Sequence, residues 1–413
     1  TDDDPQRNAY DALQSLVQTP MKLGAQRIDL RPVEGGAVQR YTVDGVTLEG
    51  RNFTRDLATS AIELTKQLAE LDPADRRKPQ TSKIKIQTEA KVKHDVDVYT
   101  AGSSAGEMLK LQIDFKKQYE RRVDTLGLLK DQNELLLSTV SAANGVVILT
   151  APEGHGLTNL AYAILRQHDA FLSQIMSIEH DPEIEIEGVK QNKLAANAPA
   201  AEESKLVNWL ISQEPDVIFV DRIDDPQTAA QLAQYAKEKR VYVTFRAPTT
   251  FDALSAWRKL VGDDQLAVDS VRLVVAERLV RVLCEACKIG YTPDADSLKK
   301  MNMSPERVTK LFQARKEPMR DQKGQEVICP FCHGLAYKGR TGVFEMFKVD
   351  DEIRQTLLAG GSTAQLKPLF RKQRQRYLQE AALSRVEKGD TSVEEVLRVL
   401  RSPSSGSRSR TSA

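Results

Sequence analysis

The chain has 413 residues and a formal net charge of +1, with 40% hydrophobic and 28% charged residues. This length exceeds one ordinary core and predicts two to four domains. The balanced charge excludes a global field that would attract nucleic acid or an anionic membrane, so no nucleic-acid partner is expected. The chain contains no run of about 18 apolar residues, so no direct membrane span is expected either.

The spacing of the four cysteines indicates the redox environment in which the protein works. All four lie in two C-x-x-C pairs, a pattern that suits metal binding in a reducing compartment better than disulfides. No signal peptide is recognised, and we expect a cytoplasmic protein. The first residue is Thr1 rather than methionine, which leaves open whether an N-terminal domain precedes it.

Residues 1–125 are predicted to form a small α+β domain. Alternating polarity predicts strands at Ala25–Leu30, Gln39–Val43, Val46–Leu48, Lys83–Ile86, Val92–Tyr99 and Met108–Ile113. Apolar residues at helical spacing predict a helix over Asp56–Leu71. The composition of Ala101–Gly106 predicts a flexible loop.

Residues 126–280 alternate short apolar strands with helical patterns. The strands are predicted at Val146–Leu149, Ile175–Ile178, Val217–Val220 and Val241–Phe245, and helices at Asn159–Arg166 and Pro226–Ala236. Strands separated by helices predict an α/β fold with a mainly parallel sheet that is covered on both faces.

Residues 281–347 carry two cysteine hooks, Cys284 with Cys287 and Cys329 with Cys332, which 41 residues separate. Two such hooks offer four thiolates to one tetrahedral zinc, and a four-cysteine site leaves no open position, so the zinc would be structural. The separation is longer than in a simple zinc ribbon, so we expect an inserted helical excursion over Asp296–Arg315. Two redox motifs or buried apolar cysteines are the alternatives.

The last part of the chain divides in two. Residues 348–401 show helical, charged patterns and are predicted to form a C-terminal helical region. Residues 402–413 are rich in serine and arginine, and this composition predicts a disordered tail.

A phosphate-binding loop without its lysine follows the strand Val146–Leu149. A nucleotide-binding P-loop reads G-x-x-x-x-G-K-[ST]. Here the eight positions read Ala-Pro-Glu-Gly-His-Gly-Leu-Thr, and Gly154 and Gly156 preserve the turn. Thr158 retains the hydroxyl that would bind Mg²⁺, but Leu157 occupies the lysine position. Leucine provides no charge-assisted hydrogen bond to phosphate, which puts the binding of ATP with Mg²⁺ in question. By itself this segment could equally be an ordinary strand-to-helix loop.

Over about Asp11–Leu400 the chain resembles the ATPases of type II secretion and type IV pilus assembly. The segments that carry the resemblance are Ala25–Leu30 with Arg40–Gly45, the Walker B-like Pro215–Val220, the cysteine pairs with Glu277–Cys284 and Tyr337–Glu345, and Val386–Leu397. The resemblance implies a RecA-like P-loop NTPase core with an N-terminal α+β domain, a zinc module and C-terminal helices. It also implies a cytosolic hexameric ring whose ATP hydrolysis drives pilus or pseudopilus assembly.

The departures from the family fall at the chemical positions. Where the family has Gly-Glu-Ile-Arg-Asp, this chain has Asp221–Asp225, so that Arg222 replaces the acidic residue that orients water. A guanidinium cannot accept a proton near neutral pH. The family's acidic box retains Glu179 and Glu183, but Phe245–Pro248 lacks the histidine of the histidine box.

Two classes of function follow. In the first, the chain is a degenerate, inactive family member that acts as a structural or regulatory subunit. It would self-associate or co-assemble with an active paralogue, at the periphery of the inner-membrane platform of the machine. In the second, it is a working ATPase that uses Glu179 or Glu183 as the base and Arg222 or Arg246 for charge. A third reading is a module that binds nucleotide without turnover, where His155 supplies positive charge only when protonated.

Overall fold

The computed structural model describes residues 5–87, 91–114, 116–195 and 198–401. The chain forms two compact units. The first comprises Thr1–Phe115 with Cys332–Gly334, and the second comprises Lys116–Phe331 with Leu335–Ala413. The predicted disordered tail, 402–413, lies outside the described residues. Within the described ranges, no helix combines the length and the apolar character that a membrane crossing requires.

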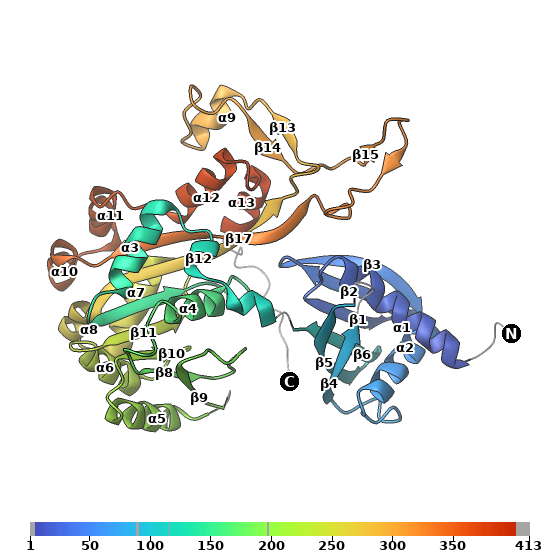
Figure 1. The fold of residues 1–413 in the computed structure, drawn as a ribbon, viewed down its shortest axis with the longest axis horizontal. Coiled ribbons are helices and arrows are strands. Elements are labelled where there is room, and N and C mark those ends of the chain that lie inside the picture. The colour runs from blue at the N-terminus through green and yellow to red at the C-terminus, as the bar shows by residue number, and fades with distance from the viewer. Residues whose placement is uncertain (1–4, 88–90, 115, 196–197, 402–413) are drawn as a thin grey trace. The chain divides into compact units, whose positions relative to one another are not determined.

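The first unit is an antiparallel sheet with two helices packed against it (Figure 1). The helices are α1 (Pro5–Lys22) and α2 (Arg55–Leu68). The strands, in the order β3-β2-β1-β6-β5-β4 across the sheet, are β1 (Arg27–Val33), β2 (Gly36–Val43), β3 (Val46–Thr54), β4 (Gln80–Gln87), β5 (Lys93–Ser103) and β6 (Gly106–Ile113). Burial alternates along β2 and β6, because one face of the sheet packs against the helices and the other does not. The predicted strands and the predicted α+β character are confirmed.

The prediction of a flexible loop over Ala101–Gly106 is wrong. Strand β5 continues to Ser103, and Ser103 pairs directly with Gly106 at the start of β6. The small residues therefore build a tight hairpin end rather than a free loop. Apolar residues further along both strands, such as Val98 and Leu111, are buried and hold the register up to the turn.

The second unit is built on a mixed sheet with the strand order β17-β12-β7-β11-β10-β8-β9. Its strands are β7 (Gly145–Thr150), β8 (Ile175–Glu179), β9 (Val189–Lys193), β10 (Val217–Val220), β11 (Arg240–Phe245), β12 (Val271–Leu283) and β17 (Tyr337–Lys348). All neighbours pair in parallel except β17, which is antiparallel to β12. The predicted mainly parallel sheet is confirmed, and the edge strand β17 was not predicted.

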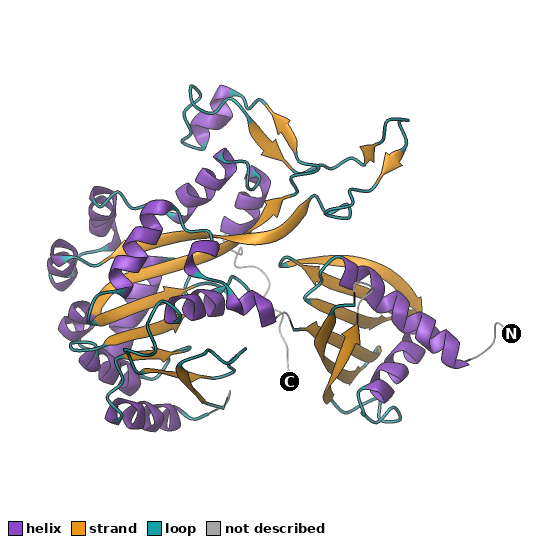
Figure 2. Cartoon of the chain, viewed as in Figure 1, coloured by secondary structure: helices purple, strands orange, loops and turns teal. Residues whose placement is uncertain are grey.

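Helices cover both faces of this sheet (Figure 2). On one face the apolar core includes residues of α3 (Lys130–Val140) and α4 (Leu157–Leu165). The opposite face is covered by α5 (Ala200–Ser212), α6 (Pro226–Tyr235), α7 (Thr250–Val261), α8 (Asp264–Ser270), α10 (Asp351–Leu358) and α11 (Thr363–Lys372). Two further helices, α12 (Leu378–Glu387) and α13 (Val393–Leu400), pack near the cysteine-bearing segment.

The segment 116–125, just after the first unit, belongs to the second unit. Two 3-10 turns, η1 (Lys116–Glu120) and η2 (Val123–Thr125), lie against α4. The Arg166 guanidinium donates to the backbone oxygen of Tyr119 at 2.7 Å. The unit boundary at 115/116 therefore lies ten residues before the boundary that the sequence predicts, since the intervening residues find their partners on α4.

The prediction of a helical excursion over Asp296–Arg315 is largely wrong. Within this range only α9 (Ala295–Lys300) is helical, and turns and the short strand β14 (Leu311–Gln313) follow it. Strand β13 (Ile289–Tyr291), which pairs with β14, precedes the range, and a hairpin of β15 (Met319–Arg320) and β16 (Glu326–Val327) comes after it. Helix α9 ends because Asn302 adopts the left-handed conformation with φ 57°, and Pro305 follows shortly afterwards.

Candidate functional site

The loop Ala151–Gly156 connects the buried strand β7 to α4, with β11 and β12 on either side of β7. Gly154 and Gly156 have φ angles of 75° and 93°, a conformation that side chains other than glycine rarely adopt. Gly156 is the N-cap residue of α4, so the free N–H groups of the first helical turn open at this loop. The backbone therefore has the form of an anion-binding loop.

The side chain of Leu157 is buried in the core and is not exposed at this loop. Its exposed fraction is 5%, and it belongs to the apolar cluster that includes Leu160 and Phe344. The position that carries a lysine in a P-loop is thus part of the hydrophobic core, and Thr158 beside it is half-buried.

His155 is held as a neutral acceptor. Its Nδ1 accepts a hydrogen bond from the backbone N–H of Leu279 at 3.0 Å. Burial, together with the nearby charges of Arg278 and Arg340, lowers the pKa of His155 to about 4. The imidazole is therefore uncharged at neutral pH and adds no positive charge to the loop.

One cation at the loop was not singled out from the sequence. The Arg340 guanidinium donates to the backbone oxygen of Gly154 at 2.9 Å. Arg340 stands on β17, whose antiparallel pairing with β12 carries it across the sheet to the loop. Its signal in the sequence is the Gly-Arg-Thr-Gly stretch, which the resemblance assigned to the zinc module.

A buried acid lies behind the loop. Glu277 of β12 is 1% exposed, and its Oε2 has no hydrogen-bond partner among the described residues. Burial raises the pKa of Glu277 to about 8, and the attraction of Arg340, Arg121 and Arg278 opposes this only in part. At neutral pH the carboxyl group is mainly protonated. Sequence reasoning missed this group, because nothing in the sequence marks it as buried.

Arg222 follows β10 in a left-handed backbone conformation, φ 54°. Its backbone N–H donates to Thr244 Oγ1 at 2.7 Å, and that hydroxyl donates to Asp221 Oδ1 at 2.9 Å. The Arg222 Nε lies 3.3 Å from Asp221 Oδ2. The guanidinium charge at this sheet edge is thus paired with the neighbouring carboxylate.

Glu179 and Glu183 occupy different environments. Glu179 is 3% exposed and accepts three hydrogen bonds, from Tyr162 Oη at 2.6 Å, Ser177 Oγ at 2.5 Å and Gln191 Nε2 at 3.0 Å. Burial, and then the bond to Glu179, raise the pKa of Tyr162. Glu183 is exposed, and its backbone N–H donates to Tyr162 Oη at 3.1 Å. The Glu179 carboxylate is saturated by its partners, so it resembles a structural group more than a free base.

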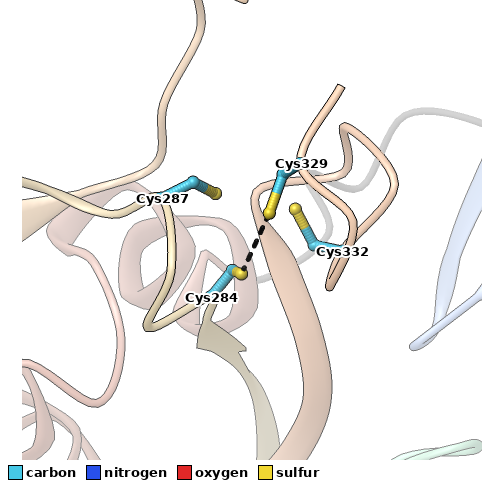
Figure 3. Close-up of side chains that lie close together, drawn as sticks. All are labelled: Cys284, Cys287, Cys329 and Cys332. Atoms are coloured by element: carbon cyan, nitrogen blue, oxygen red, sulfur yellow. Dashed lines mark hydrogen bonds between the residues drawn. The ribbon is translucent and has the colours of Figure 1, made fainter. Parts of the chain in front are cut away.

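The four cysteines converge at the end of the β12–β17 ladder (Figure 3). Leu283 pairs with Tyr337, so the hook that follows β12 meets the hook that precedes β17. All four thiols are buried, their sulfur atoms lie within 4.8 Å of one another, and the Sγ atoms of Cys284 and Cys329 are 3.8 Å apart. Four sulfurs about 2.3 Å from a tetrahedral centre are about 3.8 Å apart, so the donor set fits a structural metal site.

The model of the family described as "Type II/IV secretion system protein" matches residues 3–398. The chain belongs to this family. It is 29% identical to the type II secretion system protein HxcR of Pseudomonas aeruginosa, over 91% of this chain and 74% of the relative. It is 26% identical to the type IV pilus assembly ATPase PilB of Thermus thermophilus, over 90% of this chain and 41% of the relative.

The similarity to solved structures concerns the fold. The ATPase DotB of Legionella pneumophila superposes with a TM-score of 0.62 at 15% identity, over 92% of this chain and 93% of that chain. This similarity confirms the predicted α/β fold, and the structure of this chain shows its N-terminal sheet domain, tetracysteine cluster and C-terminal helices.

Replacement of Glu277 by glutamine is expected to remove a pH-dependent loss of stability. The pKa of Glu277 is raised from 4.5 to about 8, so its contribution is fully present below pH 4.5 and is lost as the pH rises through 8. Between pH 5 and pH 9 the unfolding free energy of the wild type should therefore fall by roughly 2–4 kcal/mol more than that of E277Q. Urea unfolding at both pH values measures this. An equal fall in both proteins would contradict the buried acid.

Replacement of Glu179 by glutamine is expected to lower the unfolding free energy by roughly 1–3 kcal/mol, because an acceptor oxygen becomes a donor facing other donors. The matched variant E183Q alters an exposed side chain and should change stability by less than about 0.5 kcal/mol. Urea unfolding at neutral pH compares the two. If E179Q were as stable as the wild type, the Tyr162–Glu179 network would not be structural.

Proposed function

We propose that this chain is a member of the secretion and pilus assembly ATPase family that does not hydrolyse ATP. It acts as a structural or regulatory subunit of a type II secretion or type IV pilus-like machine. The observation that carries the proposal is the packing of Leu157 in the hydrophobic core, at the position where phosphoryl transfer needs a lysine. Arg222, paired with Asp221, supports it, because no proton acceptor stands at the position of the water-orienting acid.

The proposed assembly into a ring is based on the parts of the fold that this chain shares with its family. The sheet, the N-terminal domain and the C-terminal helices preserve the scaffold on which a family ring is built. We infer that the chain works in the cytoplasm, peripheral to the inner membrane, in a hexameric ring with itself or with an active paralogue. It would thus contribute geometry to the machine rather than hydrolysis.

An alternative is an ATPase with relocated residues. Arg340, which donates to the loop oxygen of Gly154, offers a cation from a new direction, and Glu183 is an exposed acid near the same sheet edge. Binding of nucleotide without turnover would need only the cation Arg340. Arg246 and Arg222 are the other cations that the alternative invokes.

We also propose that the tetracysteine cluster holds one structural zinc. Cys284, Cys287, Cys329 and Cys332 would be its four ligands, and the bound ion would fix the end of the β12–β17 ladder. Four thiolates close the coordination sphere, so this zinc would take no part in hydrolysis.

The purified full chain is expected to release no phosphate from MgATP above background. Loss of the lysine and of the base each removes roughly 10²-fold or more in rate. A malachite-green assay with the PilB ATPase as positive control measures this. Steady turnover that E183Q abolishes would overturn the proposal and favour relocated catalysis. The double variant L157K/R222E, assayed in parallel, tests whether the ancestral charges restore measurable turnover.

The purified protein is expected to contain about one zinc per chain by plasma mass spectrometry. The variant C329S should lose most of this zinc and melt several degrees lower, because metal binding contributes folding free energy. The neighbouring variant H333A should retain the zinc, since His333 lies outside the clustered ligand set. Full zinc occupancy in C329S would refute the site.

A further inference from the structure

The carboxyl group of Glu277 lies directly behind the phosphate loop. Ala276 is in register with Thr150, the last residue of β7, so Glu277 stands beside the loop that follows β7. A Cβ atom placed on Gly156 would lie 2.9 Å from Glu277 Oε1 and 3.0 Å from Oε2. The carboxyl group therefore touches the backbone at the N-terminus of α4, where an anion would bind.

One oxygen atom of this carboxyl group is buried without a hydrogen-bond partner in the described ranges. Its Oε2 is unpartnered within the described part of the chain, and the residue is 1% exposed. Buried polar atoms in folded proteins nearly always have partners, and an exception calls for an explanation. A purely structural role would favour the opposite arrangement, as on β17, where the buried Glu345 accepts bonds from Thr250 and Leu378.

The charged groups around Glu277 are engaged elsewhere. Arg340 of β17 donates to the Gly154 oxygen, and Arg278 of β12 donates to backbone oxygens, including that of Pro248. Arg121, between η1 and η2, acts on Glu277 only through its charge. From the loop itself His155 contributes no charge at neutral pH, because its pKa is about 4. A phosphate in the loop would thus lie near the charges of these arginines, the exposed Glu153 of the loop itself, and one buried acid whose charge depends on a proton.

We propose that Glu277 decides whether the loop accepts a phosphate-bearing ligand, such as a nucleotide: with its carboxyl group protonated the loop binds the ligand, and with the group ionised it excludes it. Binding above neutral pH would then take up one proton at a Glu277 carboxylate oxygen. The inference rests on the proposed function for the class of ligand, because the loop belongs to a nucleotide-binding family and keeps the glycine turn at Gly154 and Gly156.

The size of the effect follows from the populations of the two forms. With a pKa of about 8, Glu277 is mostly protonated at pH 7 and mostly ionised at pH 9. If only the protonated form binds, the apparent affinity falls in proportion to its population, by about tenfold over this interval. The phosphates of ATP are already ionised at pH 7, so the ligand itself contributes little to the change.

The test is a binding titration at pH 7 and at pH 9. A fluorescent analogue of MgATP is titrated into the wild type and into E277Q. The wild type is expected to bind about tenfold more weakly at pH 9 than at pH 7, whereas E277Q binds equally at both. Calorimetry in buffers of different ionisation enthalpy should show proton uptake near pH 8 in the wild type and none in E277Q. The variant E345Q neutralises a buried acid on the neighbouring strand and should follow the wild type.

Each outcome decides the matter. Binding by E277Q but not by the wild type at pH 9 supports the proposal, even where the wild type binds weakly at pH 7. Equal affinities and equal pH profiles in both proteins overturn it, as does an absence of binding in both while thermal melting shows them folded. Phosphate release is scored separately, so ATP turnover would refute the proposed function without deciding the role of Glu277.

Discussion

The antiparallel pairing of β12 with β17 is the interaction on which both candidate sites depend. The ladder runs from Leu273 with Lys348 to Leu283 with Tyr337, and its two strands are separated by more than fifty residues in the chain. Its middle brings Glu277 and Arg340 to the phosphate loop, and its far end brings the two cysteine hooks together. A metal that fixes the far end would therefore also stabilise the register in which the loop receives its charges.

The loop has the backbone shape of an anion site, but the charged groups around it differ from those of a P-loop. The left-handed glycines and the N-terminus of α4 present backbone N–H groups, as a phosphate site requires. Leu157 at the lysine position is part of the core, and the carboxyl group of Glu277 is buried behind Gly156. In a buried site of low effective dielectric, such charges act more strongly than on the surface, so the protonation of Glu277 changes the balance of charge around the loop.

A family fold with Leu157 and Arg222 at these positions is consistent with the proposed subunit, whose role is geometric. The core sheet, the antiparallel N-terminal sheet and the C-terminal helices depend on distributed apolar packing rather than on any single side chain. Catalysis depends on a few side chains at one edge of the sheet. The presence of Leu157 and Arg222 in place of the family's lysine and acid therefore bears on chemistry far more than on fold.

The sequence by itself determined what depends on residue type and short spacing. It located the apolar strands, the glycine turn at Gly154 and Gly156, and the cysteine hooks, because chain-local geometry governs these features. Only the tertiary structure decided which strands pair, and hence that Glu277 and Arg340 meet at a loop more than a hundred residues earlier in the chain. Burial shifts the pKa values of His155 and Glu277 and so sets their charge. It is likewise a property of the packed fold, since the type of a residue does not say which other residues will surround it.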